Sequence, residues 1–246
     1  MPPSKSTTKK KNFLSKLSTR LIISLVAIAL AAGGFYLYRA HKNDTAQIYA
    51  YSYKKLTPYK LSGAKDGSGV SLNMPTEFTT ESASKPQLSQ TQFSQAMAKN
   101  DGSVVIIAHL AIASVYSGTP PSAGYLQKFS KTLTDTTSPA YNGTIQPIKD
   151  FVNRRLPTAH YNVSFDKTAA FTSDNIKTDA WQLDFTAKTK NPANERNFPP
   201  LKGKEILAVG KSTFYYFMVD AIDYNWQSKS NQSIWQQVIN SLKIDQ

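Results

Sequence analysis

Short serine motifs are the residues of this 246-residue chain that most directly suggest chemistry. Ser62, Ser82 and Ser164 are each followed three positions later by a lysine, the spacing that serine acyl-transfer enzymes use around their nucleophile. The triplet Ser173-Asp174-Asn175 matches a second motif of those enzymes, whereas their third motif, Lys-Thr-Gly, is absent. None of the three serines begins an apolar helical pattern. The motifs therefore predict no serine site.

Histidines and carboxylates form no catalytic or metal-binding cluster in the sequence either. His109 lies in an apolar strand pattern, where we expect a hydrogen-bonded core residue, and His160 lies at a loop end. A zinc site needs three or four convergent ligands. Asp220, Asp223 and Asn225 lack the spacing of an EF-hand calcium loop, so we expect them to solvate a strand end. The sequence thus predicts no catalytic residue, metal or cofactor.

Two aromatic residues are the candidate binding residues. Tyr224 and Trp226 follow the last predicted strand, and exposed aromatic side chains of this kind anchor interfaces. The same two side chains could instead seal the sheet against a final helix. We prefer packing, because few cues in the sequence mark an exposed patch.

Charge and composition limit the class of protein. Residues 1–42 carry eight Lys or Arg and no acid, so they account for much of the net charge of +13. The surplus of five positive charges in the rest of the chain is scattered, which argues against a nucleic-acid partner. The chain has no cysteine, which excludes disulfides, thiolate metal sites and a lipidated cysteine. An exported domain without cysteines is more typical of a bacterium than of a eukaryote, so the sequence favours a bacterial source.

An uncharged run of eighteen residues, Leu21 to Tyr38, is the strongest pattern in the sequence. As a helix, and with its flanks included, it is long enough to cross a hydrocarbon core of about 30 Å. Six basic residues precede it and two follow closely, which predicts a cytoplasmic N-terminus and an outside C-terminal domain at the plasma membrane. The alternative is a signal peptide cleaved after Ala29-Leu30-Ala31, which would release a secreted protein. We prefer the anchor, since the apolar run continues beyond that site.

Hydrophobic periodicity predicts an α+β domain: a largely antiparallel sheet covered by helices and preceded by one transmembrane helix. The predicted organisation is a basic cytoplasmic tail at 1–20, a transmembrane helix at 21–38, a stalk or linker at 39–68 and an extracytoplasmic domain at 69–246. Segment 49–61 is either an edge strand or part of the linker, because Pro58 and three lysines argue against a central strand. Strands are expected at 70–74, 103–114, 181–187, 204–209 and 212–222, and helices at 122–133, 144–155 and 231–242. A hairpin turn is expected at Gly210-Lys211.

The order of these elements resembles the PsbP-like α-β-α sandwich, a superfamily that includes photosystem PsbP and mycobacterial envelope lipoproteins. The resemblance covers residues 69–246 and rests on three short segments: Gly69-Val70-Ser71-Leu72-Asn73-Met74-Pro75, Phe214-Tyr215-Tyr216-Phe217-Met218-Val219 and Ser241-Leu242-Lys243-Ile244-Asp245. It implies a protein that binds or stabilises partners, and it brings no shared catalytic residues. The chain lacks the lipidated cysteine of the envelope lipoproteins, so its helix would be the anchor.

The sequence therefore predicts a membrane-anchored, extracytoplasmic, non-catalytic binding or assembly module of a bacterial cell envelope. Its expected partners are the lipid bilayer, through the N-terminal helix, and an envelope protein, a glycan or a small ligand. The alternative is a cell-envelope hydrolase or transferase with an unrecognised carboxylate or serine site. An exposed aromatic patch would favour the first function, and a deep pocket converging on Asp, Glu, Ser or His would favour the second.

Overall fold

The computed structural model describes residues 26–40, 42, 47–48, 50–80 and 90–245. The chain divides into two compact units, Met1–Gln47 and Ile48–Gln246. In the first unit, residues 26–40 are helical and expose apolar side chains such as Leu30. Within the described ranges, no helix is both long and apolar enough to cross a membrane. The basic tail at 1–20 and the first five residues of the predicted membrane segment lie outside the described residues.

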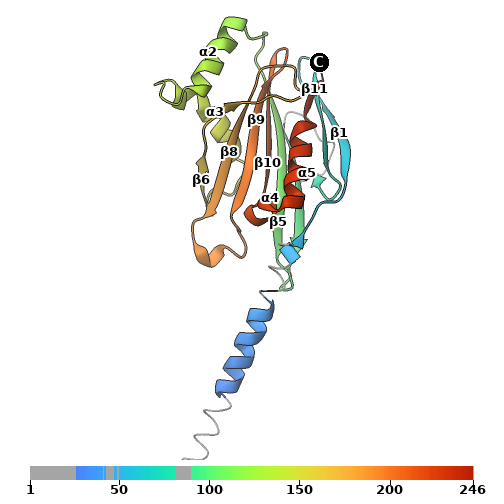
Figure 1. The fold of residues 1–246 in the computed structure, drawn as a ribbon, viewed down its shortest axis with the longest axis vertical. Helices are drawn as coiled ribbons and strands as arrows, with labels where there is room; N and C mark the ends of the chain where they lie inside the picture. The colour runs from blue at the N-terminus through green and yellow to red at the C-terminus, as the bar shows by residue number, and fades with distance from the viewer. Residues whose placement is uncertain (1–25, 41, 43–46, 49, 81–89, 246) are drawn as a thin grey trace, which may run out of the picture. The chain divides into compact units, whose positions relative to one another are not determined.

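The second unit is an α+β domain with two antiparallel sheets, as Figure 1 shows. The large sheet has the strand order β3-β4-β5-β10-β9-β8-β6, with β7 paired to β8, and the small sheet has the order β1-β2-β11. The predicted α+β class with a largely antiparallel sheet is therefore confirmed. The strands are β1 (Leu56–Ser62), β2 (Gly69–Pro75), β3 (Thr79–Thr80), β4 (Gln90–Ala98), β5 (Val104–Tyr116), β6 (Tyr161–Phe165), β7 (Ala169–Ala170), β8 (Ala180–Thr189), β9 (Leu201–Val209), β10 (Thr213–Ile222) and β11 (Lys243–Asp245).

The long helices lie where the 3.6-residue periodicity predicted them, with shifted ends. Their bounds are α2 (Ala123–Thr134), α3 (Tyr141–Asn153) and α5 (Lys229–Asn240), and a short helix α4 (Asp223–Gln227) precedes α5. Ser122 caps α2, because its hydroxyl accepts a hydrogen bond from the backbone N–H of Tyr125. The side chains of Ile145, Ile148 and Val152 form the buried face of α3.

Helices cover both faces of the large sheet. On one face, α5 lies over the sheet next to β1 (Figure 1), and a core of aliphatic and aromatic side chains lies between them. On the other face, α2 and α3 pack against the sheet through two further apolar clusters. Successive residues of a strand point to opposite faces. In β10, Phe217 therefore belongs to the α5-side core and Met218 to a cluster on the α3 side.

The compact domain begins earlier than residue 69, where the sequence analysis placed its start. Residues of the predicted stalk form β1, which pairs with β2 along its whole length as an edge strand. Tyr53 is buried, and its hydroxyl donates to Gln95 Oε1 at 2.9 Å. Pro58 is accommodated because an edge strand needs fewer ladder hydrogen bonds than a central one.

The hairpin between β9 and β10 turns one residue later than predicted. Gly210 pairs with Thr213 through a backbone hydrogen bond of 2.8 Å, which leaves Lys211 and Ser212 as the turn. Asp66, from the turn between β1 and β2, accepts hydrogen bonds from Ser212 N and from the Thr213 hydroxyl. Although burial acts in the opposite direction, these hydrogen bonds and those from Ser68 hold the pKa of Asp66 at about 2. Asp66 thus links the two sheets.

Candidate functional site

A β-bulge in β5 sets the wall of the candidate site. Gln95 pairs with Ala108 whereas the next residue, Ala96, pairs with Ile106, so Ile107 is the additional residue of the bulge. In a regular strand Ile106 would face the same side as Ala108, which belongs to the α5-side core. The bulge reverses that alternation. Ile106 instead lines a pocket on the α3 side together with His109.

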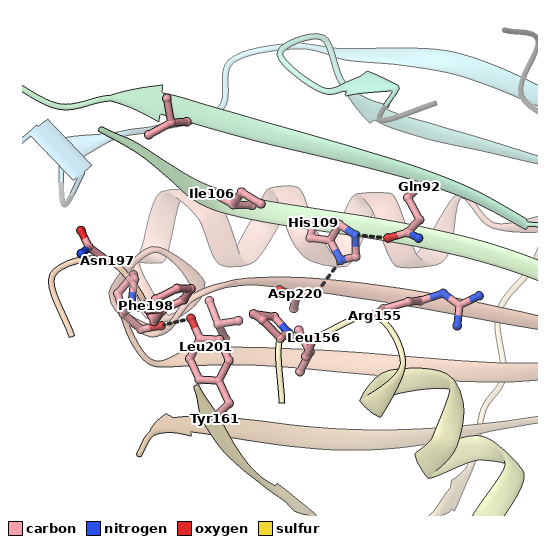
Figure 2. Close-up of a pocket in the computed structure, with 13 residues that line it drawn as sticks. Gln92, Ile106, His109, Arg155, Leu156, Tyr161, Asn197, Phe198, Leu201 and Asp220 are labelled. Atoms are coloured by element: carbon pink, nitrogen blue, oxygen red, sulfur yellow. Dashed lines mark hydrogen bonds and ion pairs between the residues drawn. The ribbon is translucent and has the colours of Figure 1, made fainter. Parts of the chain in front are cut away.

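The pocket has a volume of about 230 Å³ and lies beside the C-terminal end of α3 (Figure 2). Strands β4, β5 and β10 form one side, and the loops that follow α3 and β8 form the other. Apolar side chains make most of its surface: Val104, Ile106, Leu156, Phe198 and Leu201. At its rim Val104 is 63% exposed and Ile106 is 50% exposed. Large apolar side chains left open beside a concave surface are typical of a binding site.

Three polar side chains meet at the floor of the pocket. His109 on β5 and Asp220 on β10 are cross-strand partners, and His109 Nδ1 lies 3.3 Å from Asp220 Oδ1 (Figure 2). On the other side of the ring, His109 Nε2 lies 3.0 Å from Gln92 Oε1. The prediction of a hydrogen-bonded core histidine is confirmed. The prediction that Asp220 solvates a strand end is wrong: the residue is 2% exposed, because β5 and β9 flank it on both sides.

A glycine makes room for the carboxylate. Gly203 on β9 is the cross-strand partner of both Asp220 and Phe185. A Cβ atom at this position would lie 2.6 Å from Asp220 Cβ and 2.4 Å from Phe185 Cζ, which is far inside van der Waals contact. Glycine within a strand often marks such a close approach. Gly203 therefore allows an acid and an aromatic ring to occupy neighbouring positions on this face.

Two aromatic contacts fix the loop that closes the pocket. The hydroxyl of Tyr161 donates to the carbonyl of Pro199 at 2.9 Å, and the ring of His160 stacks on Phe198 with a centroid distance of 3.8 Å. Burial, and secondarily the charge of Asp220, raises the pKa of Tyr161. Tyr161 therefore stays a neutral hydrogen-bond donor. His160, predicted at a loop end, supports the pocket wall.

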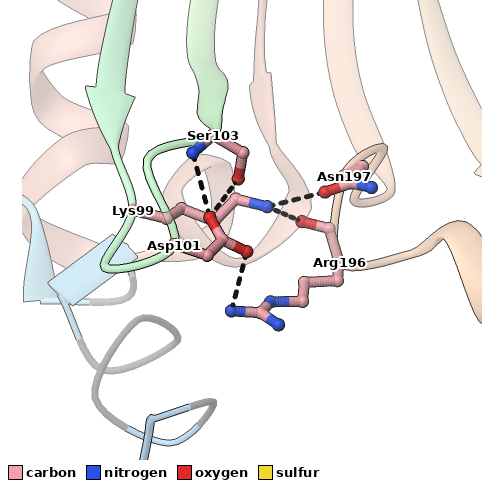
Figure 3. Close-up of polar contacts among 5 residues, drawn as sticks. All are labelled: Lys99, Asp101, Ser103, Arg196 and Asn197. Carbon is pink, nitrogen blue, oxygen red and sulfur yellow. Dashed lines mark hydrogen bonds and ion pairs between the residues drawn. The ribbon is translucent and has the colours of Figure 1, made fainter.

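A buried lysine holds the same loop from the opposite side (Figure 3). Lys99 Nζ, at the end of β4, donates to the Arg196 carbonyl at 2.7 Å and to Asn197 Oδ1 at 2.9 Å. Asp101 forms an ion pair with Arg196 at 3.2 Å and accepts hydrogen bonds from Ser103. The turn between β4 and β5 is thus tied to the segment that brings Asn197 and Phe198 to the pocket.

A second buried acid lies on the same face, away from the pocket. Glu205 on β9 is fully buried, and within the described part of the chain neither carboxylate oxygen has a hydrogen-bond partner. Burial raises the pKa of Glu205 well above its ordinary value, although the nearby charges of Arg155 and Arg154 act against this. Burial thus favours the neutral form of this carboxyl group.

Arg155 lines the pocket with its stem rather than with its charge. Its guanidinium is directed away from His109 (Figure 2), lies over the ring of Phe151 at 3.4 Å and donates to the Phe151 carbonyl at 2.9 Å. Burial, and then repulsion from Arg154, lowers the pKa of Arg155 to about 10. The side chain is thus anchored on α3.

The sheet places a serine, a histidine and an acid in one cross-strand row, which tests the hydrolase alternative. Ser94 is the β4 partner of His109, and Asp220 is its β10 partner. In a catalytic triad the histidine nitrogen opposite the acid accepts the serine proton. Here that nitrogen, Nε2, faces Gln92 Oε1. Among the thirteen described residues that line the pocket there is no serine, threonine or cysteine, so the pocket offers no nucleophile of that type.

The predicted site residues are not brought into this pocket. Tyr224 and Trp226 lie on α4; Tyr224 is 58% exposed, and Trp226 is half-buried and stacks on Trp235 with a centroid distance of 5.8 Å. The serine motifs are scattered: Ser62 ends β1, Ser164 lies on β6, and the Ser82 motif lies outside the described residues. Over the ranges that the structure describes, no three His, Asp or Glu side chains are grouped as a metal site.

Comparison with known proteins gives a likeness of fold. No protein-family model matches the chain, and no curated protein matches its sequence. Among solved structures, cyanobacterial PsbP from Synechocystis is 10% identical, with 78% of this chain and 94% of that chain covered and a TM-score of 0.47. LpqN of Mycobacterium tuberculosis, described as involved in cell envelope biogenesis, is 14% identical, with coverage of 78% and 93% and a TM-score of 0.39.

The yeast Ran-binding protein Mog1p is 7% identical, with coverage of 76% and 95% and a TM-score of 0.38. The resemblance to PsbP-like proteins that the sequence predicted is therefore confirmed as a structural likeness. At such low identities and TM-scores, no activity, ligand or partner is transferred to this chain.

Proposed function

We propose that this chain is a non-catalytic binding module of a bacterial cell envelope, held at the plasma membrane by the segment Leu21 to Tyr38 and facing outward. The observation that carries the binding role is the pocket beside β5, with its solvent-open apolar rim and its buried polar floor. The uncharged run and the basic residues before it support the anchor and its orientation.

The size and lining of the pocket limit what it binds. A volume of about 230 Å³ is smaller than the pockets of roughly 300–1,000 Å³ that enclose whole small ligands. It suits one apolar group of a larger partner, such as an aliphatic or aromatic side chain. Ile106 and Phe198 would pack against that group, and Gln92 at the floor offers an amide for a hydrogen bond. The partner we expect is an envelope protein that presents such a side chain.

Site-specific photocrosslinking in cells tests this function. A photoreactive amino acid in the full chain at Ile106 should capture a discrete envelope partner. The matched control is Val115, which lies on the same strand, is 54% exposed and does not line the pocket. Equal capture at both positions would contradict the proposal. Hydrolysis of cell-wall material by the purified full chain would replace it with the enzymatic alternative.

The proposed topology is tested separately. Protease added to intact cells should degrade the chain beyond about residue 43 and spare the basic tail. Protection of the C-terminal domain would contradict the outward orientation. A mature N-terminus at Ala32 would instead show a secreted protein released by signal-peptide cleavage.

A further inference from the structure

A second concave surface lies on the opposite side of the domain from the apolar pocket. This cleft has a volume of about 540 Å³ and runs between helices α4 and α5 and the strands β8 and β9. Its helical wall carries Trp226, Trp235, Gln232 and Gln236. Its strand wall carries mainly polar side chains, namely those of Asp184, Thr186, Lys202 and Lys204. The volume is in the range of pockets that enclose small ligands.

The charges that line the cleft cancel one another. Its lining contains two acids, Asp166 and Asp184, and two lysines. Lys204 Nζ lies 2.9 Å from Asp184 Oδ1, and Lys202 Nζ lies 3.2 Å from Asp223 Oδ1. Both lysines are thus paired with an acid, and the four charged residues of the lining sum to zero. The electrostatics therefore favour a neutral ligand.

An aromatic platform forms one end of the cleft. Trp226 is half-buried and its ring stacks on Trp235 with an interplanar angle of 14°, so the platform is rigid. A flat indole ring offers a large apolar face against which an apolar ring face of a ligand can pack. Trp235 also has a buried indole N–H that has no hydrogen-bond partner within the described residues. That N–H is enclosed by protein atoms and Trp235 is only 2% exposed, so Trp226 is the ring of the platform that a ligand can reach.

Hydrogen-bond donors and acceptors lie in the cleft that contains the Trp226 platform. The amides of Gln232 and Gln236 are exposed on α5 and, like the hydroxyl of Thr186, carry donor and acceptor atoms. Gln236 Nε2 donates one hydrogen bond to Asn240 Oδ1 at 2.8 Å, which leaves its second N–H and its Oε1 for a ligand. A neutral ligand with an apolar ring face and many hydroxyl groups matches this combination. We propose that the cleft binds a neutral glycan through one or two sugar rings. This inference goes beyond the proposed function and does not depend on the apolar pocket.

Saturation-transfer NMR on the full chain tests the glycan site. The chain is kept in amine-oxide micelles, because detergents with sugar head groups would compete for the cleft. The probes are four neutral disaccharides: chitobiose, cellobiose, maltose and trehalose. We expect transfer to at least one of them, and we expect its affinity to fall by about tenfold in Gln232→Ala and Gln236→Ala variants.

Two controls separate the cleft from the rest of α4 and α5. Gln237 is also exposed on α5 but does not line the cleft, so Gln237→Ala should bind within about twofold of the unaltered chain. Likewise Trp226→Ala should abolish transfer, whereas Tyr224→Ala, two residues away and not in the cleft lining, should keep it.

Three results would overturn the glycan site. The first is no transfer to any of the four disaccharides, and the second is an equal loss of binding in the Gln236→Ala and Gln237→Ala variants. The third is tighter binding of a sulfated disaccharide than of the neutral ones, since it would show that the lysines recognise an anion. An Ile106→Asp variant should bind the disaccharide unchanged, so this test and the crosslinking test fail independently.

Discussion

The two faces of the large sheet bury different chemistry. Beneath α5, strands β5 and β10 contribute side chains such as Leu110 and Phe217 to an apolar core. On the α3 face, the same strands contribute His109 and Asp220, and β9 contributes Glu205. Burying polar and ionisable groups is unfavourable unless they are well paired. The α3 face therefore buries ionisable groups beside its apolar clusters, and the apolar packing of both faces offsets their cost.

The largest effect should follow from a cavity in the α5-side core. Phe217 is 2% exposed and packs in that core. Replacing it in a Phe217→Ala variant should lower the free energy of unfolding by about 3–5 kcal/mol. Chemical denaturation followed by circular dichroism measures the change. Val115→Ala, at an exposed position of β5, should change it by less than about 0.5 kcal/mol. A loss below about 1 kcal/mol for Phe217→Ala would contradict the claim that the core beneath α5 stabilises the fold.

The second-largest loss of stability should come from breaking the pair of His109 and Asp220 at the pocket floor. An Asp220→Leu variant removes the acid 3.3 Å from His109 and leaves the buried imidazole without that partner. We expect the free energy of unfolding to fall by about 3 kcal/mol. Asp223→Leu serves as the control, because Asp223 forms a partly exposed ion pair with Lys202, and such pairs contribute about 1 kcal/mol or less. Equal losses in the two variants would show that the buried pair of Asp220 stabilises the fold no more than the partly exposed pair of Asp223.

Removing the contacts of Lys99 with the loop at residues 195–199 should cause a smaller loss of stability, confined largely to that loop. A Lys99→Met variant removes the two hydrogen bonds from Nζ to Arg196 and Asn197. Hydrogen bonds from charged groups contribute about 1.5–3 kcal/mol, so a stability loss of that order is expected. Hydrogen exchange at residues 195–199 should also become faster than in Lys54→Met, a variant at an exposed position. Unchanged exchange in this segment would show that Lys99 does not hold it.

Removing the second buried acid should increase stability. The pKa of Glu205 is raised above its ordinary value of 4.5, so the folded protein retains a proton that the unfolded chain releases above that pH. The contribution of Glu205 to stability is therefore greatest below pH 4.5 and falls as pH rises toward the folded-state pKa. Glu205→Leu should raise the free energy of unfolding at pH 7 by roughly 1–3 kcal/mol.

The pH dependence checks the same variant. Above pH 4.5, the stability of Glu205→Leu should decline less steeply with pH than that of the unaltered chain. A Glu205→Leu protein that is less stable at pH 7, with an unchanged slope, would mean that the carboxylate is charged and satisfied in the folded state.

Strong periodicity explains which elements could be predicted from the sequence. The alternation of Trp181, Leu183 and Phe185 with polar residues predicted β8, and the spacing of Ile145, Ile148 and Val152 predicted α3. Strand β4 was missed because most of its residues are polar or small, with Phe93 as its one large buried ring. Strand β11 was missed because three residues after a helix carry no visible period.

The candidate site depends on pairing that the sequence does not display. His109 and Asp220 are 111 positions apart and meet only because β10 lies beside β5 in the sheet. The bulge at Ile107 turns Ile106 toward the pocket, and no residue type nearby signals it. One cue was present: Asp220 lies inside the predicted strand at 212–222, whereas its partner Gly203 lies just before the strand predicted at 204–209. A histidine and an acid, each inside an apolar strand, indicate a buried polar site.

Replacing both members of the buried pair, His109 and Asp220, shows whether the pair supports binding. In a His109→Leu, Asp220→Leu chain carrying the photocrosslinker at Ile106, we measure the free energy of unfolding and the crosslinking yield together. We expect stability equal to or above that of the unaltered chain, since apolar replacement of a whole buried pair is often neutral or stabilising. We also expect crosslinking to be lost. A chain that is less stable by about 3 kcal/mol yet crosslinks normally would show that the pair serves packing, not binding.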